Sequence, residues 1–151
     1  MQNVRQKSNI KKTANTTEYC AGYGTLRPLP SEHEEQCVFV SAFRKAFRGV
    51  RIIAIPNGGW RDIKTAARLK AEGVMKGVPD LFIPEWGMWI EMKRQKGGAL
   101  SDDQKDWIAY LQSRGYKAVC CKGADEAMKA ASERNKEIND GTVTNRLGKA
   151  N

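Results

Sequence analysis

The chain has 151 residues, with 26 Lys and Arg against 17 Asp and Glu, which gives a formal net charge of +9. This length suits one domain with a modest core, and so basic a balance favours a polyanionic partner. No apolar run approaches the ~20 residues of a membrane-spanning helix, so nucleic acid is a better candidate partner than a membrane. The first residues lack the apolar region of a signal peptide, so we expect a cytoplasmic location.

The scarcity of histidine limits the chemistry that the chain can carry. His33 is the single histidine, which excludes nucleases and zinc hydrolases whose mechanisms need several imidazoles. The four cysteines include no Cys-x-x-Cys pair, so a zinc site is not expected. Any catalysis must therefore be carried by carboxylates and lysine.

A basic arm and then a helix are expected at the start of the chain. Residues 1–30 contain five basic residues against one acidic residue and show no hydrophobic period, which predicts a flexible arm that attracts phosphate. A helix is expected from Ser31, because Glu34 stands where it completes a capping box, to about Gly49. Its apolar stripe consists of three phenylalanines at intervals of four: Phe39, Phe43 and Phe47.

The next stretch is strongly basic. The β-branched run Val50–Ile55 predicts a buried strand, and after a glycine-containing break a second helix is expected from about Trp60 to Glu72. From Arg44 to Lys76 there are nine basic residues and two acidic ones. A charge stripe is usually solvated surface, but so one-sided a stretch is better explained as a track for phosphate groups. The side chains assigned to this track are Asn57, Arg61, Lys64, Arg68 and Lys76.

A predicted hairpin brings two carboxylates together. The β-prone runs Val78–Ile83 and Met88–Lys93 are joined by four residues of the kind that closes a hairpin. In the register that this loop sets, the numbers of paired residues add up to 171, so Asp80 stands opposite Glu91. Because side chains two apart on a strand share a face, Lys93 points to the same side as Glu91, about 6.6 Å along the strand.

The two carboxylates need a cation between them. Cross-strand Cβ atoms lie about 4.5–5.5 Å apart, and like charges so placed are destabilising. Mg²⁺ would offset the repulsion, since it binds one or two carboxylates together with substrate phosphate. Lys93 would supply a mobile positive charge for a phosphate or an attacking water. On these three residues alone, a solvated Glu–Lys pair beside a turn is an equally good interpretation.

After the hairpin, a loop leads to a third helix and carries two further basic residues that are assigned to DNA binding, Arg94 and Lys96. Ser101 is expected to cap this helix and Gly115 to end it. Gln104 fits two interpretations: it stands where a capping-box glutamine would stand, and it also lies on the apolar face that points towards the sheet.

The predicted order of elements is helix, strand, helix, strand, strand, helix, strand, helix. Tyr116–Cys121 is the last strand, and a short helix follows from about Ala124. This order predicts an α/β fold in which helices flank a mixed β-sheet. The chain divides into the basic arm (residues 1–30), a folded domain (31–138) and a C-terminal tail (139–151).

Several short motifs occur in an order that is more specific than any one of them. Two of them, Pro79-Asp80 and Glu91-Met92-Lys93, lie in the hairpin. The others, in chain order, are Ser31-Glu32 with Gln36, Pro56-Asn57-Gly58-Gly59, residues 66–73, Lys76–Leu81, Leu100–Gln104, Trp107 and Gly115. The ordered series, over about residues 31–123, resembles the VRR-Nuc family of the PD-(D/E)XK nuclease superfamily, and its stand-alone phage and bacterial members in particular.

The resemblance implies a restriction-endonuclease-like PD-(D/E)XK core and metal-dependent hydrolysis of phosphodiester bonds. It implies that Asp80 and Glu91 hold one or two Mg²⁺ or Mn²⁺ ions, with the carbonyl of Met92 as a further ligand. Lys93 would then orient or help to deprotonate the attacking water and stabilise the transition state.

The resemblance also assigns a site carboxylate to the first helix. The Glu-x-x-x-Gln spacing favours Glu32, but Glu35 also lies on the inward side. All three glutamates of this turn, Glu32, Glu34 and Glu35, could instead merely be stabilised by the positive N-terminal end of the helix. In the family, a glutamine at the place of Gln104 supports the site.

Stand-alone relatives are associated with branched DNA, Holliday junctions especially, and act as symmetric dimers. We therefore expect a homodimer, whose two sites would face two related strands, working in the host cytoplasm if the chain is phage-encoded. Two functions of other classes stay open: a catalytically silent DNA-binding module and a basic protein that binds a partner protein. Among enzymes, a restriction-like or mismatch-directed endonuclease acting on duplex DNA would share the same site.

Overall fold

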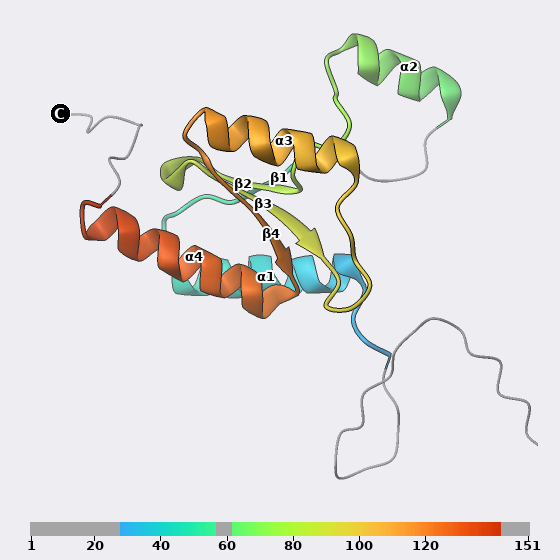
Figure 1. Cartoon of the computed structure of the whole chain (residues 1–151). Coiled ribbons are helices and arrows are strands. Elements are labelled where there is room, and N and C mark those ends of the chain that lie inside the picture. The colour runs from blue at the N-terminus through green and yellow to red at the C-terminus, as the bar shows by residue number, and fades with distance from the viewer. Residues whose placement is uncertain (1–27, 57–61, 143–151) are drawn as a thin grey trace, which may run out of the picture.

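The computed structural model describes residues 28–56 and 62–142 (Figure 1). Most of the arm predicted over residues 1–30 and most of the tail predicted over residues 139–151 lie outside these ranges. Asn57 and Arg61, which were assigned to the phosphate track, also lie outside the described residues.

A mixed four-stranded sheet lies between helices, as the sequence predicted. The elements are α1 (Glu32–Ala46), β1 (Ile53–Ala54), α2 (Ile63–Ala71), β2 (Leu81–Ile83), the 3-10 turn η1 (Pro84–Trp86), β3 (Met88–Lys93), α3 (Asp102–Ser113), β4 (Lys117–Lys122) and α4 (Ala124–Asn139). The strand order is β1-β2-β3-β4, antiparallel except that β4 runs parallel to β3. Figure 1 shows α1 and α4 on one face of the sheet and α3 on the other.

The β2–β3 hairpin has the predicted register. Leu81 pairs with Ile90 and Ile83 with Met88, so the residue numbers of each pair add up to 171. Between the strands, η1 ends at Gly87, whose φ of 53° and ψ of 38° lie in the left-handed region that glycine adopts without strain. Because side chains alternate along β3, those of Glu91 and Lys93 point to one face of the sheet and that of Ile90 points to the other.

The core lies between the sheet and the helices α1 and α4. Phe39 and Phe43 of α1 are fully buried, as are Met88, Ile90 and Met92 of β3. The predicted capping box begins α1, since the Ser31 hydroxyl accepts from the Glu34 amide and the Glu34 carboxylate accepts from the Ser31 amide. The phenylalanine stripe thus fixes which face of α1 meets the sheet.

Two predictions about individual elements were wrong. The run Val50–Ile55 forms no buried strand: only Ile53–Ala54 joins the ladder, at the sheet edge, and both residues are exposed. β-branched composition indicates a strand but not whether a neighbouring layer covers it. The last helix is not short, because α4 extends over 16 residues. Its buried face consists mainly of alanines, which give only a weak hydrophobic pattern: Ala124, Ala127 and Ala131.

The helix α2 stands apart from the rest of the domain (Figure 1). Asp62 caps it by accepting from the Thr65 amide at 3.0 Å, and none of its residues is buried. It agrees with the predicted second helix except at the start, where Trp60 lies outside the described residues. In the part of the chain that the structure describes, no helix combines the length and apolarity needed to cross a membrane.

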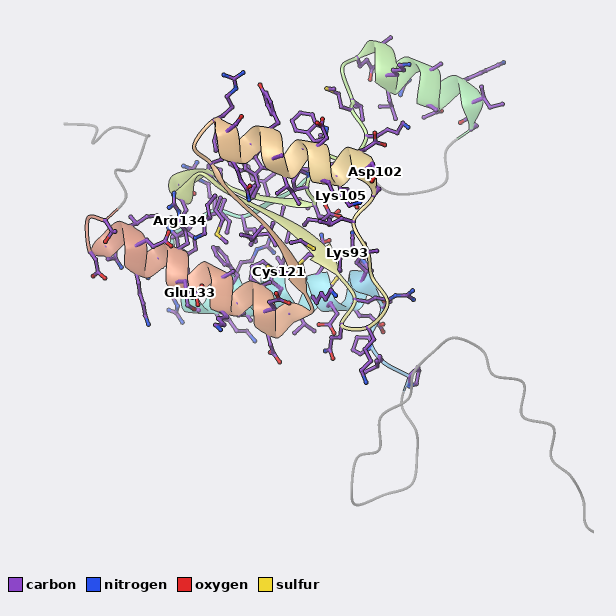
Figure 2. All side chains as sticks on the ribbon, viewed as in Figure 1. Lys93, Asp102, Lys105, Cys121, Glu133 and Arg134 are labelled. Atoms are coloured by element: carbon purple, nitrogen blue, oxygen red, sulfur yellow. The ribbon has the colours of Figure 1, made fainter. Side chains whose placement is uncertain are left out.

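Arg134 attaches α4 to the turn η1. Its Nε and Nη2 donate to the Trp86 carbonyl at 3.0 and 2.8 Å, and it is only 7% exposed (Figure 2). We expect Arg134→Ala to lower the free energy of unfolding by about 1–3 kcal/mol, because it removes both donors from a buried carbonyl. Urea unfolding measures this, and Glu133→Ala on the exposed side of α4 should change it by less than about 0.5 kcal/mol. Equal effects of the two substitutions would contradict the assignment.

Candidate active site

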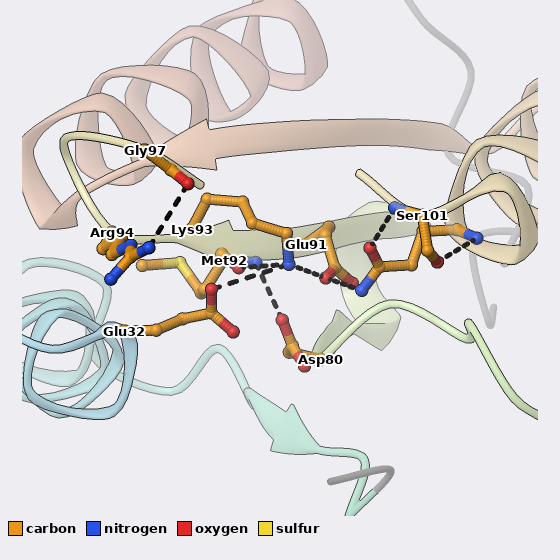
Figure 3. Close-up of polar contacts among 9 residues, drawn as sticks. Glu32, Asp80, Glu91, Met92, Lys93, Arg94, Gly97 and Ser101 are labelled. Carbon is orange, nitrogen blue, oxygen red and sulfur yellow. Dashed lines mark hydrogen bonds and ion pairs between the residues drawn. The ribbon is translucent and has the colours of Figure 1, made fainter. Parts of the chain in front are cut away.

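The structure brings the side chains assigned to catalysis together at the end of β3 (Figure 3). They come from four segments: α1, the residue before β2, the strand β3 and the start of α3. The residues are Glu32, Asp80, Glu91, Lys93 and Gln104. Side chains far apart in the sequence thus meet around one lysine.

Lys93 is enclosed by acceptors. Its Nζ donates to Oε1 of Glu91 and, at 3.0 Å, to the carbonyl oxygen of Met92. Oε2 of Glu32 lies 3.6 Å from the same nitrogen. Burial lowers the pKa of Lys93, but the hydrogen bond and charge of Glu91, with the charges of Glu32 and Asp80, outweigh this effect and raise the pKa above its ordinary value. Lys93 is therefore protonated at neutral pH.

Glu91 is held by one carboxylate oxygen and leaves the other without a donor. Oε1 accepts from Lys93 Nζ and from Gln104 Nε2. Oε2 is buried and has no hydrogen-bond partner, one of two such side-chain atoms among the described residues. Burial raises the pKa of Glu91 to about 7, aided by the charge of Asp80 and opposed by Lys93. A buried carboxylate oxygen without a donor is the feature that a cation would satisfy.

Asp80 faces the same end of the sheet and is fixed from two sides. Its Oδ2 accepts from the Met92 amide at 2.9 Å, and its main-chain carbonyl accepts from the Ile55 amide at 2.7 Å. Burial raises its pKa, although the Met92 amide, the charge of Lys93 and the neighbouring Glu91 side chain lower it in part. Two carboxyl groups with raised pKa values thus lie at one place, which is a feature of functional sites.

Gln104 satisfies both interpretations that its sequence position allowed. The side-chain Oε1 of Gln104 accepts from the Ser101 main-chain amide at 2.9 Å. The main-chain amide of Gln104 donates to the Ser101 hydroxyl at 3.2 Å, which completes the capping box of α3. Because Oε1 faces Ser101, the Nε2 group is directed at Glu91. The cap that begins α3 therefore also orients a donor towards the site.

The structure distinguishes the roles of Glu32 and Glu35, which the sequence left open. Glu32 is partly exposed and forms the ion pair with Lys93. Glu35 is only 4% exposed and accepts from Gln95 Nε2 and from the Ala124 amide, both at 2.7 Å. Glu32 is therefore the carboxylate of α1 that lies beside Lys93. Sequence analysis did not identify Gln95, because nothing local connects it with a helix 60 residues earlier.

The residues present fit a hard cation with an incomplete protein ligand set. Among the described residues, no group of three or more His, Cys, Asp and Glu side chains is arranged to hold a metal ion. Asp80 and Glu91 supply two carboxylates, one with an unpaired buried oxygen. This matches Mg²⁺, which binds one or two carboxylates and completes its shell with water and phosphate. The carbonyl of Met92 accepts from Lys93, so it can become a ligand only if that bond breaks.

The basic side chains assigned to DNA come from two parts of the chain: α2 with the segment just after it, and the loop after β3. Lys64 and Arg68 are exposed on α2, and Lys76 lies just beyond it, 3.6 Å from Asp103. Arg94 and Lys96 lie in the exposed loop after β3.

Comparison with known proteins identifies the class. Residues 27–125 match the VRR-NUC domain, which is a nuclease-type domain. The chain therefore belongs to the VRR-NUC family, and the predicted relationship is confirmed. A solved structure described as "VRR_NUC domain protein" has 30% sequence identity and a TM-score of 0.58, with coverage of 72% of this chain and 90% of that one. Among curated proteins no significant match is found.

The raised pKa of Glu91 predicts a pH dependence of stability. A carboxyl whose folded pKa of about 7 exceeds its ordinary value of 4.5 holds its proton more tightly in the folded state, so stability is lost as pH rises between these values. We expect Glu91→Gln to remove this loss. In urea unfolding with EDTA, the stability of the variant relative to the wild-type protein should rise by on the order of a few kcal/mol from about pH 5 to about pH 8. A difference that does not change with pH would contradict the assignment.

Proposed function

We propose that the protein is a metal-dependent endonuclease that hydrolyses phosphodiester bonds in DNA, with Mg²⁺ or Mn²⁺ as its ion. The observation that carries the proposal is the buried Oε2 of Glu91, which has no donor, in a site shared with Asp80 and a protonated lysine. An ion held there would lower the pKa of a bound water and neutralise charge on the phosphate.

The protein's own contribution begins with the orientation of the two carboxylates. Lys93 and Gln104 both donate to Oε1 of Glu91, which leaves Oε2 as the oxygen available to an ion. The Met92 amide donates to Oδ2 of Asp80 and so orients this carboxylate as well. These contacts fix the two ligands before an ion or DNA binds, which reduces the rearrangement needed during reaction.

Lys93 acts as a cation rather than as a base in this proposal. Its neighbours raise its pKa, so it carries a proton at neutral pH. A protonated ammonium donates hydrogen bonds to water or to a phosphate oxygen and stabilises the negative charge that develops there. Glu32, 3.6 Å from Lys93 Nζ and partly exposed, completes the acidic cluster and keeps the ammonium directed at the site.

Branched DNA, with Holliday junctions first, is the substrate class that we propose, and a homodimer is the proposed assembly. Both are carried over from stand-alone relatives, and a two-fold dimer suits paired incisions. A restriction-like or mismatch-directed endonuclease would use the same residues on duplex DNA. A panel of labelled junction, flap, splayed and linear DNA, incubated with Mg²⁺, Mn²⁺ or EDTA, separates these cases. DNA binding without metal-dependent product would favour a catalytically silent module.

Removal of Lys93 or Asp80 should abolish cleavage. We expect Lys93→Ala and Asp80→Ala to show no metal-dependent product while their DNA affinity changes by less than about threefold, because phosphate contacts elsewhere supply most of the binding. Cleavage of labelled junction DNA and a binding titration measure the two quantities. Lys129→Ala, which removes an exposed lysine of α4 outside the basic stretch, is the matched control and should cleave normally. Cleavage at the wild-type rate by either site variant would refute the assignment.

The helix α2 should contribute to binding and not to chemistry. Lys64 and Arg68 are exposed, so each alanine substitution should weaken DNA binding and reduce the slope of log K against log salt by roughly 0.9. Titrations at several salt concentrations give this slope. Lys105→Ala removes an exposed charge from α3 that pairs with Asp102 and should leave the slope unchanged. A slope unaffected by both Lys64→Ala and Arg68→Ala would exclude α2 from the interface.

A further inference from the structure

One buried carboxylate near the site has no part in the chemistry proposed above. Glu35 lies one helical turn after Glu32 on α1 but forms no ion pair with Lys93. Its two oxygens accept instead from Gln95 Nε2 and from the Ala124 amide, each at 2.7 Å. It thereby joins three segments that are distant in sequence: α1, the loop after β3 and the start of α4. Burying a carboxylate is costly, so a fully bonded one marks a fixed arrangement.

The loop that Glu35 holds also covers the stem of Lys93. This loop, residues 94–98, folds back so far that a Cβ atom added at Gly98 would lie 3.0 Å from Cβ and 3.2 Å from Cδ of Lys93. Lys93 is only 6% exposed, although the residues that follow it directly are exposed. The backbone of the loop is therefore part of what keeps water away from Lys93.

The junction between β4 and α4 closes around the same contact. The Gly123 amide donates to the carbonyl of Lys93 at 2.8 Å. A Cβ atom at Gly123 would lie 2.9 Å from Cγ of Gln95 and 3.3 Å from Oε2 of Glu35, and φ is +86°. Only glycine fits this position without displacing Gln95. Three segments thus pack together next to Lys93: Gly123 after β4, the loop 94–98 and α1.

We propose that Glu35 is a positioning residue, which through Gln95 holds the loop 94–98 closed over Lys93. The proposal rests on the proposed endonuclease function in assigning Lys93 its role. A charge-assisted hydrogen bond is about twice as strong as a neutral one, and a short loop with two adjacent glycines needs such a tether to stay in one conformation. When the tether is lost, water reaches Lys93 and competes for its contacts with Glu91.

Two substitutions test the tether without removing any residue of the site. Gln95→Glu sets two carboxylates against each other and should open the loop. Glu35→Gln combined with Gln95→Glu restores both contacts, because the amide introduced at position 35 can donate to position 95 and still accept from Ala124. The combined variant also has the net charge of the wild-type protein, so its recovery cannot come from a change of total charge.

The first measurement is independent of nuclease activity. An amine-reactive reagent is applied at mildly alkaline pH, and labelling of Lys93 is compared with that of the exposed Lys45 by mass spectrometry. We expect Gln95→Glu to increase labelling of Lys93 by at least about threefold, and the combined variant to return it towards the wild-type level. Gln95→Ala, which removes the bond without repulsion, gives the same readout if Gln95→Glu does not fold. Glu133→Ala on the exposed side of α4 is the control.

The second measurement links the tether to the reaction. In single-turnover cleavage of junction DNA at saturating protein, where the rate does not depend on DNA affinity, the rate should fall by roughly tenfold in Gln95→Glu and recover in the combined variant. If folded Gln95→Glu and Gln95→Ala both label at Lys93 as slowly as the wild-type protein, the proposal is wrong. If labelling responds as expected but the wild-type protein cleaves no DNA, closure by Glu35 stands and the endonuclease function fails.

Discussion

The buried ion pair between Lys93 and Glu91 is the constraint on which the rest of the domain depends. Two charges removed from water are tolerated only when further hydrogen bonds satisfy them. The Met92 carbonyl and Glu32 complete the surroundings of Lys93, and Gln104 supplies the second donor to Glu91. Each partner comes from a different element, so the helices α1 and α3 must both be in place before the pair is stable. The fold and the site therefore form together.

The hairpin and the caps could be predicted from sequence because local rules determine them. A four-residue connection sets one register, and the alternation along β3 then places Glu91 and Lys93 on one face. Burial of β1 could not be predicted, because it depends on which layer happens to cover the sheet edge. The choice between Glu32 and Glu35 had the same difficulty: helical spacing directs both inward, and only distant contacts decide which one meets Lys93.

Gln104 illustrates why structural and functional interpretations of one residue need not compete. A glutamine amide has an acceptor end and a donor end, and the capping box uses the acceptor. The donor end is then directed at Glu91 by the same geometry. A substitution at this position would change both the start of α3 and the orientation of the carboxylate. Mutational effects here must be interpreted through the site and through the helix at once.

The central proposal is that Asp80 and Glu91 form one cation site, with the unpaired Oε2 of Glu91 as a ligand. Titration of Mn²⁺ followed by electron paramagnetic resonance, with and without junction DNA, measures this most directly in the wild-type protein and in Asp80→Asn, Glu91→Gln and the surface control Glu133→Gln. We expect the two site variants each to lose the bound Mn²⁺ signal while the control keeps it. Equal Mn²⁺ affinity in all four proteins would contradict it.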